Sequence, residues 1–117
     1  QPSNPIAITG DVHSSWVHDL KLDFKNPNSP TVGTEFVGTS ISSNFPKQFI
    51  PTATIATSKN PHTKFFNGTY RGYVRCHLTR DRLVTNYRIV STIRQPEASV
   101  RTLASFVVEN GKLGVRS

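Results

Sequence analysis

The second half of the sequence alternates apolar and polar residues with a period of two, and this pattern constrains the fold more than any other feature. Between Leu83 and Arg94, one side of the segment carries Leu83, Thr85, Tyr87, Ile89, Ser91 and Ile93. Residues two apart share one face of a β-strand, so this alternation predicts a strand.

Turn residues divide the second half into successive strands. We expect strands over 63–67, 70–79, 83–94 and 100–109. They are separated by Asn67-Gly68, by Arg80-Asp81-Arg82 and by a connection over 95–98 that contains Pro96, and Asn110-Gly111 follows the last of them. The second half is therefore predicted to be an antiparallel meander.

The first half is less regular. Residues 5–10 form a short apolar run that predicts a strand buried in the middle of a sheet. Residues 14–24 fit a short helix and a strand equally well, whereas 25–31 contains two prolines and two asparagines and indicates a loop. Strand character returns over 32–39. The Ser-, Thr- and Pro-rich stretch 40–59 predicts a long irregular segment with room for one short helix.

Composition fits one small domain of 117 residues, of which 35% are hydrophobic. The formal charge of +7 favours anionic partners such as phosphates. The basic residues are spread along the sequence, so we expect most of them on the solvated faces of strands. No segment is apolar enough to cross a membrane, and no signal peptide is visible. Methionine is absent, so we expect a processed product or a piece of something longer.

The single cysteine, Cys76, excludes a disulfide within the chain. It lies in an alternating segment, and we expect a buried structural thiol. A zinc site made from Cys76 and His77 is disfavoured, because neighbouring strand residues point to opposite faces.

Residues Gly10-Asp11-Val12-His13 follow the first apolar run directly and combine a carboxylate with an imidazole two residues away. This pair suits a hard or borderline metal ion at the end of a strand. Two simpler readings compete locally: Asp11 caps the following segment, and His13 is an ordinary loop histidine.

Four segments, taken in order, resemble the PhoD-like alkaline phosphatases of the calcineurin-like metallophosphoesterase group. They are Thr9–Trp16, Gly33–Ser43, Asn60–Phe66 with Arg71-Gly72-Tyr73 just after it, and Val100–Gly111. The resemblance covers nearly the whole chain. The family's earlier motifs, an Asp-x-His-type pair, a Gly-Asp and an Asn-bearing loop, have no counterpart before Gly10.

The resemblance implies an α/β fold: the C-terminal portion of a metallophosphoesterase β-sandwich, made mostly of strands. We expect one partial domain over 1–117. Its first part, 1–59, holds the metal-ligand strand and the irregular segment, and its second part, 60–117, holds antiparallel strands. The implied cofactors are iron and calcium, with Asp11 and His13 as two of the ligands and Asp11 in place of the first His of the wider group's Gly-His-x-His motif.

The implied function is metal-dependent hydrolysis of phosphate esters by an alkaline phosphatase or phosphodiesterase. The remaining ligands would come from an N-terminal portion of the same enzyme or from a second chain, so the isolated chain is expected to be inactive. The family also implies a secreted or extracytoplasmic location, and nucleic acid enters only as a diester substrate.

Three further residues are candidates for the site. His62 is a catalytic candidate, with a surface-loop histidine as an equal alternative. Trp16 and Arg71 are substrate-pocket candidates; core packing competes for Trp16, and a solvated strand charge competes for Arg71. The alternative functions are a basic β-rich module that binds polyanions or phosphate without catalysis, and a non-catalytic fragment.

Overall fold

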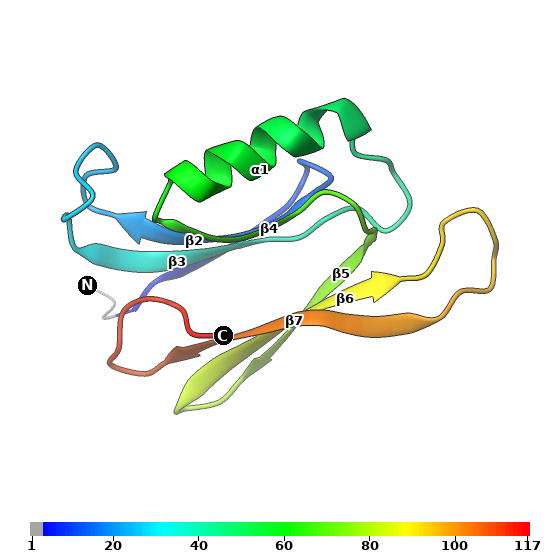
Figure 1. Ribbon diagram of the computed structural model, residues 1–117. Helices are drawn as coiled ribbons and strands as arrows, with labels where there is room; N and C mark the ends of the chain where they lie inside the picture. Colours follow the sequence, from blue (N-terminus) through cyan, green and yellow to red (C-terminus); the bar gives the residue numbers. More distant parts are fainter. Residues whose placement is uncertain (1–3) are drawn as a thin grey trace.

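The computed structural model describes residues 4–117 and arranges them as two facing β-sheets with one helix outside them (Figure 1). The first sheet has the order β1-β3-β2-β4, and its strands are β1 (Ile6–Thr9), β2 (Ser15–Lys21), β3 (Thr31–Val37) and β4 (Thr63–Asn67). The second has the order β5-β6-β7, with strands β5 (Gly72–Leu78), β6 (Arg82–Val90) and β7 (Val100–Glu109). The mostly β architecture and the antiparallel meander of the second half are thus confirmed.

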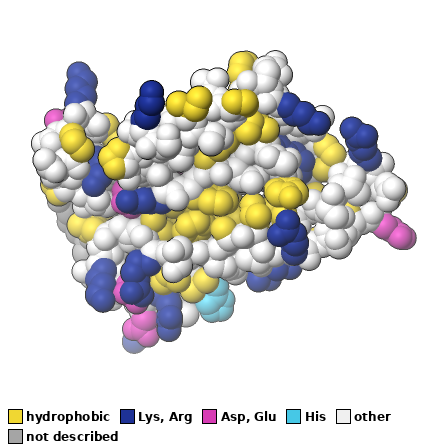
Figure 2. All heavy atoms as spheres, viewed as in Figure 1, with side chains coloured by type: hydrophobic (Ala, Val, Ile, Leu, Met, Phe, Trp, Pro, Cys, Tyr) yellow, Lys and Arg dark blue, Asp and Glu magenta, His cyan; other side chains and the backbone are white. Residues whose placement is uncertain are grey.

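The core lies between the two sheets and follows the alternation that the sequence displays. Leu83, Tyr87 and Ile89 of β6 are buried, and so is Thr85. They face the first sheet, whose β2 and β3 contribute Val17 and Phe36. Hydrophobic side chains form a band between the two layers, while Lys and Arg side chains are scattered over the same face (Figure 2).

The stretch predicted as irregular, with room for one short helix, contains a helix. A 3-10 turn over Lys47–Phe49 leads into helix α1 (Ile50–Lys59). Pro51 stands in the first helical turn, where its missing N–H costs nothing. The helix lies across the outer face of the first sheet, alongside β4 (Figure 1).

Segment 14–24, which fitted two structures, contains strand β2. In contrast, β1 is a correction. It was expected in the middle of a sheet, but it forms the edge of the first sheet, and Ile8 is 60% exposed. The strand expected to reach Arg94 ends at Val90. Strand β4 pairs antiparallel with β2 and so belongs to the first sheet.

Cys76 is a second correction, since it is exposed and not buried. It lies in the outer half of β5, an edge strand whose residues from Arg75 to Leu78 are all exposed. Its sulfur lies 3.6 Å from the hydroxyl of Thr85. Among residues 4–117, no helix is long and apolar enough to cross a membrane.

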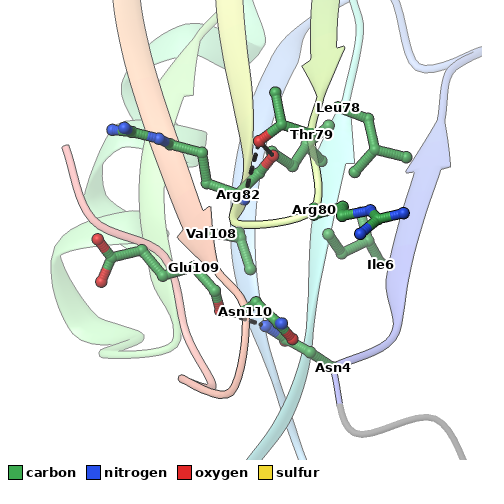
Figure 3. Close-up of a pocket in the computed structure, with 10 residues that line it drawn as sticks. Asn4, Ile6, Leu78, Thr79, Arg80, Arg82, Val108, Glu109 and Asn110 are labelled. Carbon is green, nitrogen blue, oxygen red and sulfur yellow. Dashed lines mark hydrogen bonds between the residues drawn. The ribbon is translucent and has the colours of Figure 1, made fainter.

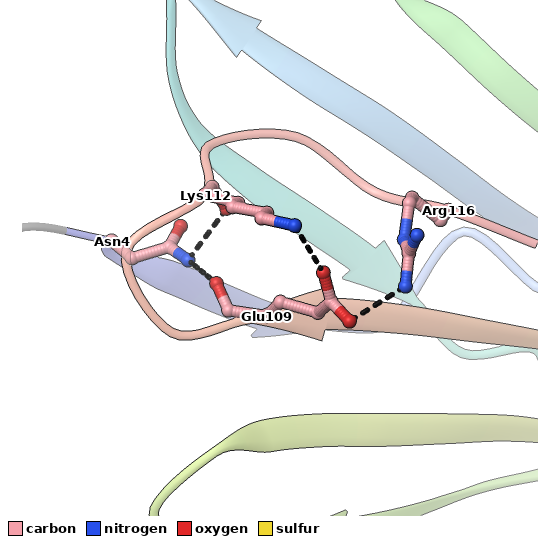
Figure 4. A network of polar contacts seen from close by, with 4 residues as sticks. All are labelled: Asn4, Glu109, Lys112 and Arg116. Atoms are coloured by element: carbon pink, nitrogen blue, oxygen red, sulfur yellow. Dashed lines mark hydrogen bonds and ion pairs between the residues drawn. The ribbon is translucent and has the colours of Figure 1, made fainter.

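A polar network joins the beginning and the end of the described chain (Figure 4). The Asn4 amide donates to the carbonyls of Glu109 and Lys112, at 2.9 and 3.0 Å. The Glu109 carboxylate pairs with Arg116 at 2.6 Å and with Lys112 at 3.3 Å. Both cationic side chains are exposed, so these ion pairs contribute little, about 0–1 kcal/mol each.

Candidate functional site

Three loops meet at one end of the first sheet, just beyond the ends of strands β1, β3 and β4. Strands β1 and β3 run parallel with Thr9 opposite Val37, so the loops that follow them, 10–14 and 38–46, leave from the same side. The Gly38 amide donates to the Thr9 carbonyl at 2.9 Å. Strand β4 ends at Asn67 opposite Ser15, which brings the 67–71 turn to the same place.

Asp11 and His13 lie in the first of these loops, and both have left-handed backbones, with φ of 75° and 61°. Left-handed conformations of residues other than glycine cost about 1–3 kcal/mol each and gather at functional sites. Among residues 4–117, no group of three or more His, Cys, Asp or Glu side chains could hold a metal.

The imidazole of His13 is oriented in a way that suits a metal ligand. Its Nδ1 lies 3.3 Å from the carbonyl oxygen of Asn44 in the 38–46 loop. With the proton assigned to Nδ1, this contact is a hydrogen bond, and Nε2 keeps its lone pair. Metal-binding histidines commonly donate their second ring N–H to a carbonyl in this way. The exposed carboxylate of Asp11 supplies a hard oxygen two residues away.

Arg71 is not a solvated strand charge, and its role in a substrate pocket stays a prediction. The residue is only 5% exposed, although it borders depressions of about 250 and 330 Å³ beside the 38–46 loop. The guanidinium donates to the backbone carbonyls of His13, Ser43 and Gly68, one from each loop. Burial lowers the pKa of Arg71 from its ordinary value.

A depression of about 530 Å³ lies between α1 and the outer face of the first sheet. Gly10 and Val12 of the 10–14 loop, named the ligand loop for its predicted metal ligands Asp11 and His13, border it, and Trp16 contributes to its lining. The Trp16 indole stacks on His18 with ring centres 5.4 Å apart, and its Nε1 donates to the Ser14 hydroxyl at 2.8 Å. Trp16 therefore lies beside this depression, and its role in a substrate pocket stays a prediction.

His62 also borders the depression, but it is not brought beside Asp11 and His13. It precedes β4, whereas the ligand loop lies near the other end of that strand. Five residues of extended chain separate His62 from Asn67, or roughly 16 Å. The half-buried imidazole contacts Phe24 edge-on, with 5.1 Å between ring centres.

Sequence reasoning missed His18 and Glu35, which also line the depression. They are opposite each other on β2 and β3, on the face away from the core. Burial lowers the pKa of His18, the Glu35 carboxylate opposes this, and His62 adds to the lowering. Alternation along the strands could have indicated both residues. His18 follows the buried Val17 and Glu35 precedes the buried Phe36, so both side chains are expected on the opposite, outer face of the sheet.

A smaller depression of about 140 Å³ lies at the far end of the sandwich, beside Ile6 and the β5–β6 turn (Figure 3). Arg80 and Arg82 border it, but their guanidinium groups extend in opposite directions (Figure 3). These two cations therefore do not converge on one anion.

Comparisons with known proteins agree on one relationship. A family model described as PhoD-like phosphatase matches residues 1–87. Alkaline phosphatase D of Bacillus subtilis (strain 168) is 42% identical over 116 residues, which is 97% of this chain and 20% of that protein. A solved structure described as that of PhoD matches with a TM-score of 0.76 and 37% identity, over 95% of this chain and 21% of the other. The chain thus spans about a fifth of the length of each relative. Its sequence and its two-sheet fold agree in placing it in the PhoD-like phosphatase family.

Proposed function

We propose that this chain supplies part of the active centre of a metal-dependent phosphatase or phosphodiesterase and acts together with further polypeptide. The observation that carries the proposal is the ligand loop. Asp11 and His13 both have left-handed backbones and lie within three residues, at the end of the sheet where three loops meet. Membership of a phosphatase family supports the same reaction class.

The residues present fit a share of a metal cluster. The Asp11 carboxylate suits calcium, and the Nε2 of His13 suits iron, the two metals that the family resemblance implies. When bound, such ions would polarise the phosphoryl group and lower the pKa of a bound water. The chain's own residues would orient the ligands: the Asn44 carbonyl, 3.3 Å from Nδ1 of His13, would favour the tautomer protonated there.

The depression beside the ligand loop would hold the organic part of the ester. Its walls combine the indole of Trp16 with polar groups from β3 and α1. In this arrangement His62 would contact only a substrate long enough to extend along β4. Its assignment as a catalytic acid or base requires an approach of about 2.6–3.2 Å to the reacting proton.

The test uses the native polypeptide that carries this chain. Metal content is measured by elemental mass spectrometry, and hydrolysis is measured with p-nitrophenyl phosphate and bis(p-nitrophenyl) phosphate. We expect bound metal and hydrolysis of at least one ester. Asp11→Asn and His13→Gln should each lower bound metal and kcat by at least about 100-fold, because each removes a direct ligand.

Asp81→Asn and His77→Gln are the matched controls, since both residues are exposed and far along the chain from the ligand loop. They should retain full metal and activity. A native polypeptide with no metal and no hydrolysis of either ester would refute the proposal. So would Asp11 and His13 variants that behave like their controls.

The competing function is a basic module that binds polyanions without catalysis, and the charge of +7 is the observation in its favour. Its prediction is salt-sensitive binding of oligonucleotides with no turnover. The scattered Lys and Arg side chains, and the divergent pair Arg80 and Arg82, give it less support (Figures 2 and 3).

An extracytoplasmic location forms part of the proposal and comes from the family resemblance alone. Fractionating source cells and detecting the native polypeptide with an antibody against this chain would test it. Recovery only from the cytoplasm would refute it.

A further inference from the structure

We propose that Arg71 is a positioning residue: its buried guanidinium clamps the Asp11–His13 loop to the two neighbouring loops and so holds both metal ligands in place. This inference rests on the proposed function, because it concerns the same site. It differs from a substrate-binding role, in which the cation would face the ester directly.

The guanidinium of Arg71 donates hydrogen bonds to three backbone carbonyls. One terminal nitrogen, Nη1, donates to the His13 carbonyl and, at 3.2 Å, to the Ser43 carbonyl. The other, Nη2, donates to the Gly68 carbonyl at 2.6 Å. One planar group therefore bonds three loops that are distant in sequence, and the rigid fork of arginine suits this better than the single ammonium of lysine.

The backbone of Arg71 is itself held on both sides, so the clamp has a fixed base. The Arg71 carbonyl accepts from the Val90 amide of β6 at 2.9 Å. The next residue, Gly72, donates its amide to the Ser40 carbonyl at 3.0 Å. Arg71 thus connects the ligand loop to strand β6 of the second sheet through hydrogen bonds.

The electrostatics exclude a simple ion-pair role within the described chain. No carboxylate in residues 4–117 pairs with Arg71, so its charge is satisfied by carbonyl dipoles. Burying a cation is costly unless it is hydrogen-bonded, and the three backbone carbonyls supply these bonds. The bonded carbonyl of His13 belongs to one of the two left-handed residues, so the clamp acts directly on the strained segment.

The test compares Arg71→Met and Arg71→Lys with wild type in the native polypeptide, and Arg75→Met is the control because Arg75 is exposed on β5. Methionine keeps most of the apolar stem and removes all five donors, and lysine keeps the charge with one nitrogen. Four quantities are measured: metal retained after dialysis against a chelator, kcat and KM for an aryl phosphate, thermal midpoint, and hydrogen–deuterium exchange.

In Arg71→Met we expect metal retention and kcat to fall by about 10- to 100-fold, the usual effect of losing a group that orients a ligand. KM should change by less than about 3-fold, because substrate binding is not touched. Amides in 10–14 and 38–46 should exchange at least about 10-fold faster, while those of β6 and β7 keep their rates. Arg71→Lys should lie between wild type and Arg71→Met.

Three results would overturn the inference. One is a raised KM with kcat and metal retention unchanged, which would make Arg71 a substrate contact. Another is wild-type exchange in both loops. If Arg71→Met does not fold, Arg71→Lys decides: full metal retention with wild-type exchange would refute the clamp. A wild-type polypeptide without metal or activity refutes the proposed function instead, and the exchange data still test the clamp separately.

Discussion

Replacing Tyr87 with phenylalanine should destabilise the sandwich measurably, because its hydroxyl joins the two sheets. Tyr87 is 2% exposed, and its hydroxyl donates to the Trp16 carbonyl on β2 at 2.6 Å. Its ring keeps contacts with Phe65 and Phe106 at centre distances of 5.3 and 5.8 Å, and phenylalanine preserves these. The change therefore isolates one buried hydrogen bond between the layers.

The expected loss of stability depends on the Trp16 carbonyl, which loses its hydrogen-bond donor in the variant. A buried hydrogen bond contributes about 0.5–1.5 kcal/mol, and an acceptor left unsatisfied costs about 1–3 kcal/mol. We expect the Tyr87→Phe variant to lose about 1–2 kcal/mol. The entropy of unfolding of a chain of this size is about 0.25 kcal/mol per kelvin, so the thermal midpoint should fall by roughly 4–8 °C.

The assay is urea and thermal unfolding of wild type, Tyr87→Phe and the control Tyr73→Phe, whose residue is 41% exposed. Burial raises the pKa of Tyr87 above its ordinary value of 10.0. The unfolded state therefore releases this proton first as pH rises past 10, and the advantage of wild type over Tyr87→Phe should shrink there. A loss below about 0.5 kcal/mol, or an equal loss for Tyr73→Phe, would refute the reasoning.

Three further changes have clear expected outcomes. Gly72→Ala should destabilise by about 3 kcal/mol or prevent folding, since an added Cβ would lie 1.9 Å from the Arg88 carbonyl oxygen; unfolding curves will show it, and a neutral result would contradict the close approach. Burial lowers the pKa of His18, so as pH falls through 6.5 the unfolded state takes up its proton first and the free energy of unfolding drops. His18→Gln should remove part of this drop in thermal melts recorded between pH 7 and pH 5, and an unchanged drop would argue against it. The exposed Cys76 thiol should react fully with a disulfide reagent in the folded chain, with Cys76→Ser stable within about 0.5 kcal/mol; a thiol that reacts only after unfolding would show that it is covered.

Local patterning predicted the meander because alternation and turn residues act over a few neighbouring positions. Strand β7 was placed at its observed bounds, and the buried face of β6 was identified residue by residue. The edge position of β1 was missed because an apolar run reads the same in the middle of a sheet and at its edge. Cys76 was misplaced for a related reason: alternation gives two faces, and only packing decides where along β5 the covered part ends.

The candidate site also has a part that is local in sequence and was predicted, and a part that depends on distant contacts and was not. The ligand pair lies within four consecutive residues, so sequence alone singled it out, and its role in metal binding stays a prediction. The contacts of Arg71 were out of reach, because its three partners are backbone carbonyls, which carry no side-chain signature, and the most distant of them lies 58 positions from Arg71. Helix α1 was only allowed for, since its Ser- and Thr-rich sequence has modest helix propensity.

The exposed border at β1 has a practical consequence for anyone who purifies the chain. On its outer side, the strand offers peptide groups that pair with nothing in the described residues, flanked by the apolar Ile8. Such a margin is a template on which another copy can add, so concentrated samples should form oligomers or precipitate. A lysine at position 8 would place a charge along that margin and keep preparations monodisperse.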